Sequence, residues 1–261
     1  MMPHKSSSYL VESISVTNQI YRHRRLLTAL LLALAGGLNS IHQNSAEAQD
    51  QHDFGTWFSL NTQGPLTVKQ NTPARLRWWF DGHLRYLTDS GGFHQTIMRP
   101  GIGYALNDRT SIWMGYGWIN ELPTNQGPIF DENRFWQQLI WNRPIGRSSY
   151  MSRTRLEQRF RDAGDDTGWR LRQFCKLSVP LDCQKRWSWV VWDEIFFDLN
   201  ETDWGQIGSF SQNRLFTGLG CNLKGLNRPR IEVGYLNQFI RNPIEEDPIN
   251  HVVSANWFWS F

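Results

Sequence analysis

Residues 150–161, with the sequence YMSRTRLEQRFR, carry charged side chains at every second position. These are Arg153, Arg155, Glu157, Arg159 and Arg161. Clustered guanidinium groups pair with carboxylates, and a carboxylate beside another one can serve as a general acid or base. A β-strand would place all five charges on one face, because successive side chains point to opposite sides. With so many arginines around Glu157, we expect salt-bridged structure rather than an acid–base pair with Glu194 or Glu232.

A serine–histidine pair is the second arrangement that could do chemistry, since some small membrane barrels are lipid hydrolases. Such a site needs both side chains together on one face, with a third group orienting the histidine. His251 and Ser254 are three positions apart, so a strand places them on opposite faces. His94 and Ser211 could both face outward, but nothing in the sequence makes their strands neighbours. We therefore assign no catalytic residue, and an enzyme is the less favoured interpretation.

The three cysteines, Cys175, Cys183 and Cys221, have no CxxC spacing, so we expect no metal site and no cofactor. In an oxidising compartment they could form one disulfide with one thiol left over, or all three could stay unpaired. The glycine-spaced segments GIGYALND and GLGCNL lie within strand patterns and lack a following helix. They are therefore not phosphate-binding loops.

Alternation of apolar and polar residues recurs along the chain, and no segment shows a helical stripe. The runs cover residues 54–60, 74–81, 96–106, 111–120, 132–141, 150–161, 169–179, 187–198, 210–222, 230–239 and 250–261. Strands of about this length, separated by Gly, Asn, Asp and Pro, are typical of membrane barrels. The sequence therefore predicts an all-β fold, an antiparallel transmembrane β-barrel.

The predicted connections alternate in length. Shorter ones cover residues 107–108, 142–149, 180–186 and 223–228, and longer ones cover 81–92, 121–131, 200–209 and 241–248. Short turns at one end and long loops at the other are typical of outer-membrane barrels, although 162–168 is shorter than this pattern requires. Because bacterial barrels have an even number of strands, we expect about 12, within a range of 10 to 12. Leu66–Gln70 is the candidate for the twelfth.

The charged face of such a barrel must line the lumen. An arginine that faces lipid at the bilayer midplane costs about 2–4 kcal/mol, so four of them would cost as much as a typical whole folding stability. The predicted lumen charge network comprises Glu132, Arg134, Arg153, Arg155, Glu157, Arg159, Arg170, Arg172, Glu194, Arg214 and Glu232, with Asp81 and Asp198 as further acidic partners. Arginine is in excess, so we expect a net positive lumen balanced by water or by a small anionic solute.

A soluble periplasmic barrel of lipocalin-like type is the alternative fold. It would expose the charged face and bury the tryptophan-rich face. Tryptophans occur on both faces, however: Trp79, Trp113 and Trp136 on one, and Trp78, Trp118 and Trp141 on the other. The chain also combines 14 tryptophans with a negative mean hydropathy of −0.51. A membrane barrel, apolar on one face of each strand and polar on the other, explains both features.

The two ends of the chain carry export and assembly signals. Arg22, Arg24 and Arg25 precede an apolar run, Leu26–Leu38, that is too short to span a membrane, and AEA at 46–48 fits a cleavage site. We predict a cleaved signal peptide over residues 1–48 and a barrel domain over 49–261. The final strand ends on Phe261, which resembles the signal read by the barrel-assembly machinery of the bacterial outer membrane. The net charge of +3 argues against a nucleic-acid partner.

The segments RTRLEQRF, WDEIFFD, NRLFTGLG and IEVGYL, with GTWFSL, GIGYAL, MGYGW and ENRFWQQ upstream, carry a family resemblance. Together they resemble a widespread bacterial outer-membrane β-barrel family known only as a domain of unknown function. The resemblance covers nearly all of residues 54–261. It implies a barrel in the outer membrane of a Gram-negative cell and implies no activity. By this resemblance, Arg153, Arg155, Glu157, Arg159, Glu194, Arg214 and Glu232 are lumen residues.

Three functions from different classes follow from this sequence. The barrel is structural, its lumen filled by the charge network, or it is a narrow porin-like pore that selects anions. The third function is a lipid-modifying outer-membrane hydrolase.

Overall fold

The computed structural model describes residues 52–66, 75–88, 91–122, 129–224, 229–242 and 247–261. All of them belong to one unit, Gln49–Phe261. The predicted signal peptide lies outside the described residues, so its assignment stays a prediction.

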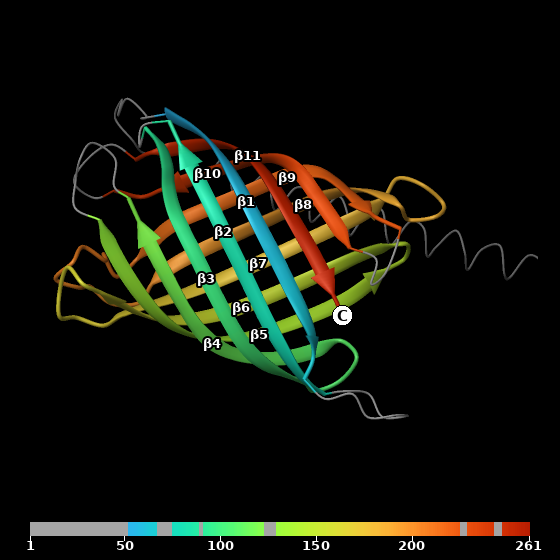
Figure 1. Ribbon diagram of the computed structural model, residues 1–261, viewed down its shortest axis with the longest axis horizontal. Coiled ribbons are helices and arrows are strands. Elements are labelled where there is room, and N and C mark those ends of the chain that lie inside the picture. Colours follow the sequence, from blue (N-terminus) through green and yellow to red (C-terminus); the bar gives the residue numbers. More distant parts are fainter. Residues whose placement is uncertain (1–51, 67–74, 89–90, 123–128, 225–228, 243–246) are drawn as a thin grey trace, which may run out of the picture. The chain divides into compact units, whose positions relative to one another are not determined.

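Eleven strands form a closed barrel (Figure 1). The strands are β1 His52–Pro65, β2 Leu76–Leu87, β3 Gly92–Ala105, β4 Thr110–Glu121, β5 Phe130–Ile145, β6 Ser148–Arg161, β7 Gly168–Pro180, β8 Trp187–Asp198, β9 Phe210–Asn222, β10 Arg230–Ile240 and β11 Ile249–Ser260. Each strand pairs in antiparallel fashion with the next one along the chain, and β1 closes the barrel against β11. Each predicted alternating run corresponds to one strand, so the prediction of an all-β antiparallel barrel is confirmed.

The expected even number of strands is wrong. The closing pair is parallel, with His52 opposite Ile249 and Gln63 opposite Ser260. A parallel closing pair removes the need for even parity, because the first and last strands then run in the same direction. β1 also pairs directly with β2, so the wall has no place for a strand between them. The predicted twelfth strand, Leu66–Gln70, lies outside the described residues except for Leu66, which follows β1.

The connections fall at two ends, which we call the C-terminal mouth and the opposite mouth. The C-terminal mouth holds Phe261 and the ends of β1, β3, β5, β7, β9 and β11, and the opposite mouth holds the starts of these strands. Of the fully described connections, 106–109, 146–147 and 181–186 lie at the C-terminal mouth, and 162–167 and 199–209 lie at the opposite mouth. The predicted long loop at 81–92 is mostly strand, because β2 continues to Leu87. Its alternation persists past Gly82, with Asp81, Arg85 and Leu87 buried.

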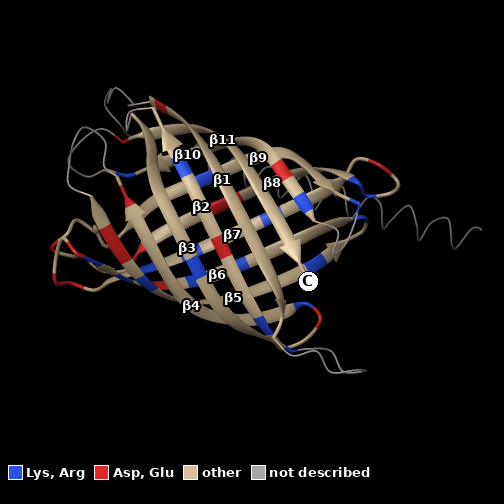
Figure 2. Cartoon of the chain, in the orientation of Figure 1, with Lys and Arg blue, Asp and Glu red and all other residues tan. Residues whose placement is uncertain are grey.

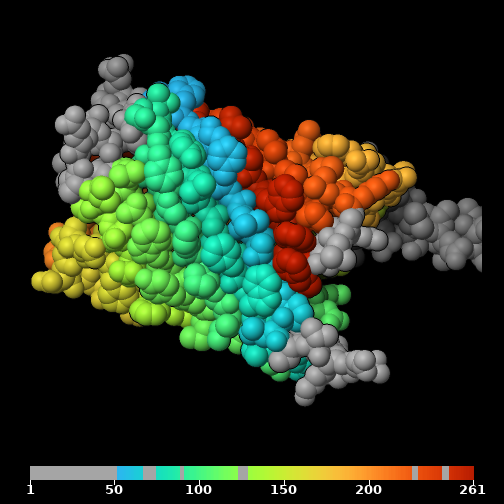
Figure 3. All heavy atoms as spheres, viewed as in Figure 1, coloured from blue at the N-terminus to red at the C-terminus, as the bar shows by residue number. Residues whose placement is uncertain are grey.

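The two faces of the wall differ in chemistry. On β6, Arg155 and Glu157 are 0% exposed, whereas Phe160 on the other face is 38% exposed. Charged positions occur both along the strands and in the connections at both ends (Figure 2). The visible outer face of β1 to β4 and β11 is a continuous wall of packed side chains (Figure 3). Within the described part of the chain, no helix is long and apolar enough to cross a membrane.

Tryptophan side chains fill part of the interior. Trp136 of β5 is fully buried and lies over Gly115 of the adjacent strand β4 and Gly101 of the next strand, β3. A Cβ atom at either glycine would clash with the indole, so glycine is needed there to let the ring approach the wall. The indole Nε1 of Trp136 donates to the carbonyl of Tyr116 over 3.1 Å. A second buried apolar cluster joins Trp57, Val190, Phe216, Leu236 and Val252. The interior therefore combines a charge network with packed aromatic groups.

Candidate functional site

Glu132 on β5 anchors one end of the predicted charge network. Its Oε1 accepts hydrogen bonds from Nε of Arg134 and from Nε of Arg159, each over 2.6 Å. A further bond runs from Arg159 Nη2 to Glu132 Oε2 over 2.9 Å. Arg134 and Arg159 lie directly opposite each other on β5 and β6, so the shared carboxylate offsets the repulsion between two guanidinium groups.

Two carboxylates cross-link β6, β7 and β8 in the middle of the barrel. Glu157 accepts from Arg172 Nη1 over 2.6 Å and from Arg134 Nη1 over 3.4 Å. Glu194 accepts from Arg153 Nη2 and from Arg172 Nη2, each over 2.8 Å. Arg172 therefore bridges both carboxylates, and their carboxylate oxygens are held in place by charged donors. Because both Glu157 and Glu194 are held in ion pairs, neither carboxylate is free to act as a base.

Arg155 lies at the centre of the run and has mostly neutral partners. Its Nε and Nη2 donate to Gln138 Oε1 over 2.9 and 2.7 Å, and its guanidinium group lies 4.7 Å from the Trp136 ring centroid. Its Nη1 is 3.7 Å from Glu157 Oε1 and lacks a hydrogen-bond partner among the described residues. Stacking on an indole face supports a buried guanidinium group that has few acceptors.

The other expected acidic partners contact different basic groups. Glu232 accepts from Lys176 Nζ over 2.7 Å and from Arg230 Nε over 2.7 Å. Asp198 pairs with Arg170 over 2.6 Å. Asp81 forms a two-bond pair with Arg99, over 2.8 and 2.9 Å. Of the acidic residues considered as partners for the charged run on β6, Glu132 and Glu194 contact it, and these three pair with basic residues of other strands.

Arg85 and Arg214 have no ion pair among the described side chains. Both guanidinium groups face the Trp57 ring, at 4.0 Å and 5.1 Å from its centroid. Sequence reasoning missed Arg85, because residues 81–92 read as a loop, and it did not select Arg99. The continued alternation from Asp81 to Leu87 was the signal that could have found Arg85.

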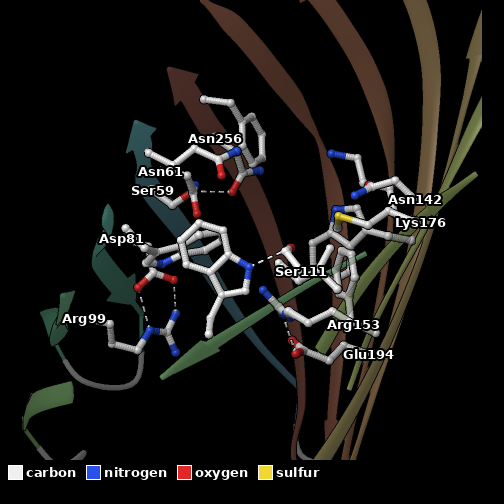
Figure 4. Close-up of a pocket in the computed structure, with 18 of the residues that line it drawn as sticks. Ser59, Asn61, Asp81, Arg99, Ser111, Asn142, Arg153, Lys176, Glu194 and Asn256 are labelled. Carbon is white, nitrogen blue, oxygen red and sulfur yellow. Dashed lines mark hydrogen bonds and ion pairs between the residues drawn. The ribbon is translucent and has the colours of Figure 1, made fainter. Parts of the chain in front are cut away.

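The interior space divides into two neighbouring cavities, and a third, of about 620 Å³, lies at the C-terminal mouth. The larger of the two interior cavities, of about 430 Å³, opens among residues of this mouth such as Asn107 and Arg109. Figure 4 shows the Asp81–Arg99 and Arg153–Glu194 pairs in its wall. The smaller, of about 140 Å³, lies toward the opposite mouth. The two share Trp57, Arg85, Arg99, Arg172 and Arg214 as lining residues.

Basic side chains predominate in both cavities. The larger is lined by the basic residues Arg77, Arg85, Arg99, Arg109, Arg153, Arg172, Lys176, Arg214 and Arg230 and by the acidic residues Asp81, Asp108 and Glu194. The smaller is lined by seven arginines and by Glu121 as its acidic residue. A cleft lined by one sign of charge, with low-dielectric walls, concentrates ions of the opposite sign. The arrangement is suited to hold anions.

The candidate serine–histidine pairs do not assemble a catalytic site. His94 lies on β3 and Ser211 on β9, and these strands are not neighbours in the wall. His94 Nδ1 lies 2.9 Å from the carbonyl oxygen of Leu122. Ser254 is buried inside the barrel, whereas His251 contacts the Tyr235 hydroxyl over 2.6 Å.

The cysteines are all free thiols: Cys175 and Cys221 are partly buried, and Cys183 is exposed. The described residues hold no group of three or more His, Cys, Asp or Glu side chains able to bind a metal ion.

Comparison with known proteins identifies a family. Residues 54–248 match the model of a family described as protein of unknown function (DUF2490). An uncharacterized protein of Methylorubrum extorquens is 32% identical over 243 residues, a stretch that covers 91% of this chain and 98% of the relative. No solved structure matches the chain. The expected resemblance to a domain of unknown function is confirmed, and the chain belongs to the DUF2490 family.

Proposed function

We propose that this protein is an outer-membrane β-barrel with a narrow, anion-selective lumen. The observation that carries the proposal is the reversed polarity of the wall, with charge inside and apolar surface outside. Outward-facing apolar side chains that are more than two-fifths exposed occur around the barrel: Phe58, Leu60, Leu84, Met98, Ile102, Met114, Leu139, Leu219, Val233 and Val253. In water this surface would be an aggregation hazard, whereas acyl chains would cover it.

Aromatic residues near the two mouths support a membrane location. Exposed rings at the C-terminal mouth are Tyr104, Trp141, Trp187, Trp257 and Phe261, and those at the opposite mouth are Phe54, Tyr86, Trp169 and Phe197. Aromatic girdles at both interfaces flank the apolar band of outer-membrane barrels. A soluble lipocalin-like barrel would have the opposite polarity, because its apolar face would surround the ligand cavity.

The proposed anion selectivity rests on the lining of the interior. Basic residues outnumber acidic ones in both cavities, and Arg109, Arg143, Arg147 and Lys185 extend the basic surface to the C-terminal mouth. The side chains shared by the two cavities constrict the lumen, so passage would be limited to small ions. A purely structural barrel is the second candidate, favoured by the buried ion pairs of Glu132, Glu157 and Glu194.

The membrane location is tested by fractionating cells that express the full chain and by gel mobility of the extracted protein. We expect the protein in the outer-membrane fraction, with a faster-migrating form that disappears on boiling, as a closed barrel gives. Recovery as a soluble periplasmic protein would contradict the proposal.

Anion selectivity is tested in planar bilayers by the reversal potential in a potassium chloride gradient. We expect small anion-selective currents. Arg109→Glu should reduce the selectivity, because Arg109 is exposed at the C-terminal mouth and lines the larger cavity. Arg186→Glu is the matched control, since Arg186 is exposed at the same mouth and is absent from the lining of the three cavities. Complete absence of current would favour the structural barrel, and cation-selective current would overturn the proposal.

A further inference from the structure

We propose that the smaller cavity is a binding site for one tetrahedral oxyanion, phosphate or sulfate. The inference rests on the proposed function in one respect: the lumen must admit anions. It requires neither conductance nor a particular membrane.

The charge balance of the cavity is the first argument. Its basic lining residues are Arg85, Arg99, Arg134, Arg159, Arg170, Arg172 and Arg214. Five of them are already paired: Arg99 with Asp81, Arg134 and Arg159 with Glu132, Arg170 with Asp198, and Arg172 with Glu157 and Glu194. Arg85 and Arg214 remain without a carboxylate partner among the described side chains. Glu121, the acidic residue of the lining, reaches Arg85 only through Gln95, so the lining keeps a net positive charge that favours an anion.

Arg85 supplies a buried donor without an acceptor. The residue is 7% exposed. Its Nη1 donates to Gln95 Oε1 over 2.7 Å, and Gln95 Nε2 donates to Glu121 Oε2 over 2.8 Å. Its Nε has no hydrogen-bond partner among the described residues. A buried charged donor left unsatisfied is costly, so an acceptor supplied by a ligand would stabilise this side chain.

Arg214 approaches the same place from β9. Its guanidinium group lies 4.7 Å from the Phe196 ring centroid. When the Gln212 amide is oriented so that both its oxygen and its nitrogen have suitable partners, Gln212 Oε1 accepts a hydrogen bond from Arg214 Nε over 2.8 Å. Arg85 and Arg214 both contact Trp57, so two like charges share one indole. Cation–π contact offsets only part of the cost of burying each charge, whereas an anion between them would offset their mutual repulsion as well.

The size and polar lining of the cavity fit a small oxyanion. Its volume of about 140 Å³ is roughly that of four or five water molecules, and a phosphate or sulfate ion has five heavy atoms. Besides the arginines, the amide side chains of Gln95, Gln212, Gln238 and Asn250 line it and carry N–H donors. Planar guanidinium groups bind tetrahedral oxyanions through paired hydrogen bonds. The site shares five lining residues with the larger cavity, which opens at the C-terminal mouth, so an anion would enter past these side chains.

Calorimetric titration of the full chain in detergent, after exhaustive dialysis against a buffer free of oxyanions, tests the site. We expect saturable binding of one sulfate or phosphate per chain, quenching of tryptophan fluorescence, and no such response to chloride at equal ionic strength. Arg85→Gln and Arg214→Gln should each weaken binding at least tenfold. Arg77→Gln removes an arginine that lines only the larger cavity and should change the affinity less than twofold.

If a variant does not assemble into a barrel, the titration of the wild-type protein still tests the site. Absence of saturable sulfate and phosphate binding overturns the site, as does unchanged affinity in both arginine variants. A phosphomonoester that binds more tightly than either inorganic ion overturns the assignment to a free ion. Binding without anion current leaves the site standing and refutes the proposed passage, whereas current without binding does the reverse.

Discussion

The inner and outer faces of β6 share one backbone and differ in almost every other respect. Inside, Arg155 and Glu157 are fully buried and are held by charged or amide groups of β5 and β7. Outside, Gln158 exchanges hydrogen bonds with Gln137 on an exposed surface, and Phe160 contacts Phe135 at 6.1 Å between ring centroids. Adjacent residues of one strand therefore lie in different environments, one buried and the other exposed. The loss in free energy of unfolding caused by a substitution should therefore depend more on the face that carries the residue than on the residue type.

The largest expected difference comes from Glu157→Ala. The change removes the carboxylate that accepts hydrogen bonds from Arg172 and Arg134, so these two buried guanidinium groups each lose a charged partner. Loss of one partner from a buried ion pair costs on the order of 3–5 kcal/mol. Urea unfolding of the reconstituted barrel measures the loss. Gln158→Ala, one position along on the outer face, is the control and should cost less than about 1 kcal/mol. Equal losses would remove the distinction between the faces.

Met114→Arg introduces a charge on the outer face of β4, where Met114 is 57% exposed. If this position faces the middle of a bilayer, the substitution costs about 2–4 kcal/mol in folding into lipid vesicles. Leu106→Arg is the matched control, because Leu106 is also exposed but lies in the connection at the C-terminal mouth. There the cost should be only about 0–1 kcal/mol. Similar small effects at both positions would indicate that the outer face meets water.

Gly101→Ala tests packing on the inner face. The added Cβ would clash with the Trp136 indole, and overpacking of this kind costs about 1–3 kcal/mol. Trp136→Phe replaces the indole by a smaller phenyl ring. In the same urea assay, the double variant should therefore lose less stability than the sum of the losses in the two single variants. Additive losses would show that Trp136 is not the group that requires glycine.

The smallest effect on stability is expected at the exposed connection between β7 and β8, residues 181–186. The Asp182 carboxylate accepts backbone hydrogen bonds from Trp187 (2.8 Å) and Arg186 (2.9 Å), and these bonds hold the pKa of Asp182 below its usual value. Its stabilising contribution is therefore present above the ordinary aspartate pKa of about 3.9 and is lost as the pH falls through the lowered value.

Unfolding measured between neutral pH and the acid range checks this expectation. The wild type should lose more stability on acidification than Asp182→Asn does, because the amide does not titrate. Identical losses would mean that these backbone bonds do not favour the charged form.

Local patterns account for the strands and for the face on which each charge lies. Arg153, Arg155, Glu157 and Arg159 alternate without interruption, so one strand can be read from them alone. Arg85 shows the limit of such reading: Gly82 before it and the Asp, Ser and Gly residues at 89–92 after it suggest a loop, although the alternation itself persists. Ladder hydrogen bonds with β1 and β3 make this segment strand.

The sequence by itself determined the barrel class and the sorting of charged and apolar residues, because a period of two is a property of each strand alone. Only the tertiary structure decided the parallel closure of β1 on β11 and the pairing of Glu232 with Lys176. It also decided that Arg85 and Arg214 meet at Trp57. These contacts join strands far apart along the chain, and their geometry depends on how the closed barrel brings its inner faces together across the lumen.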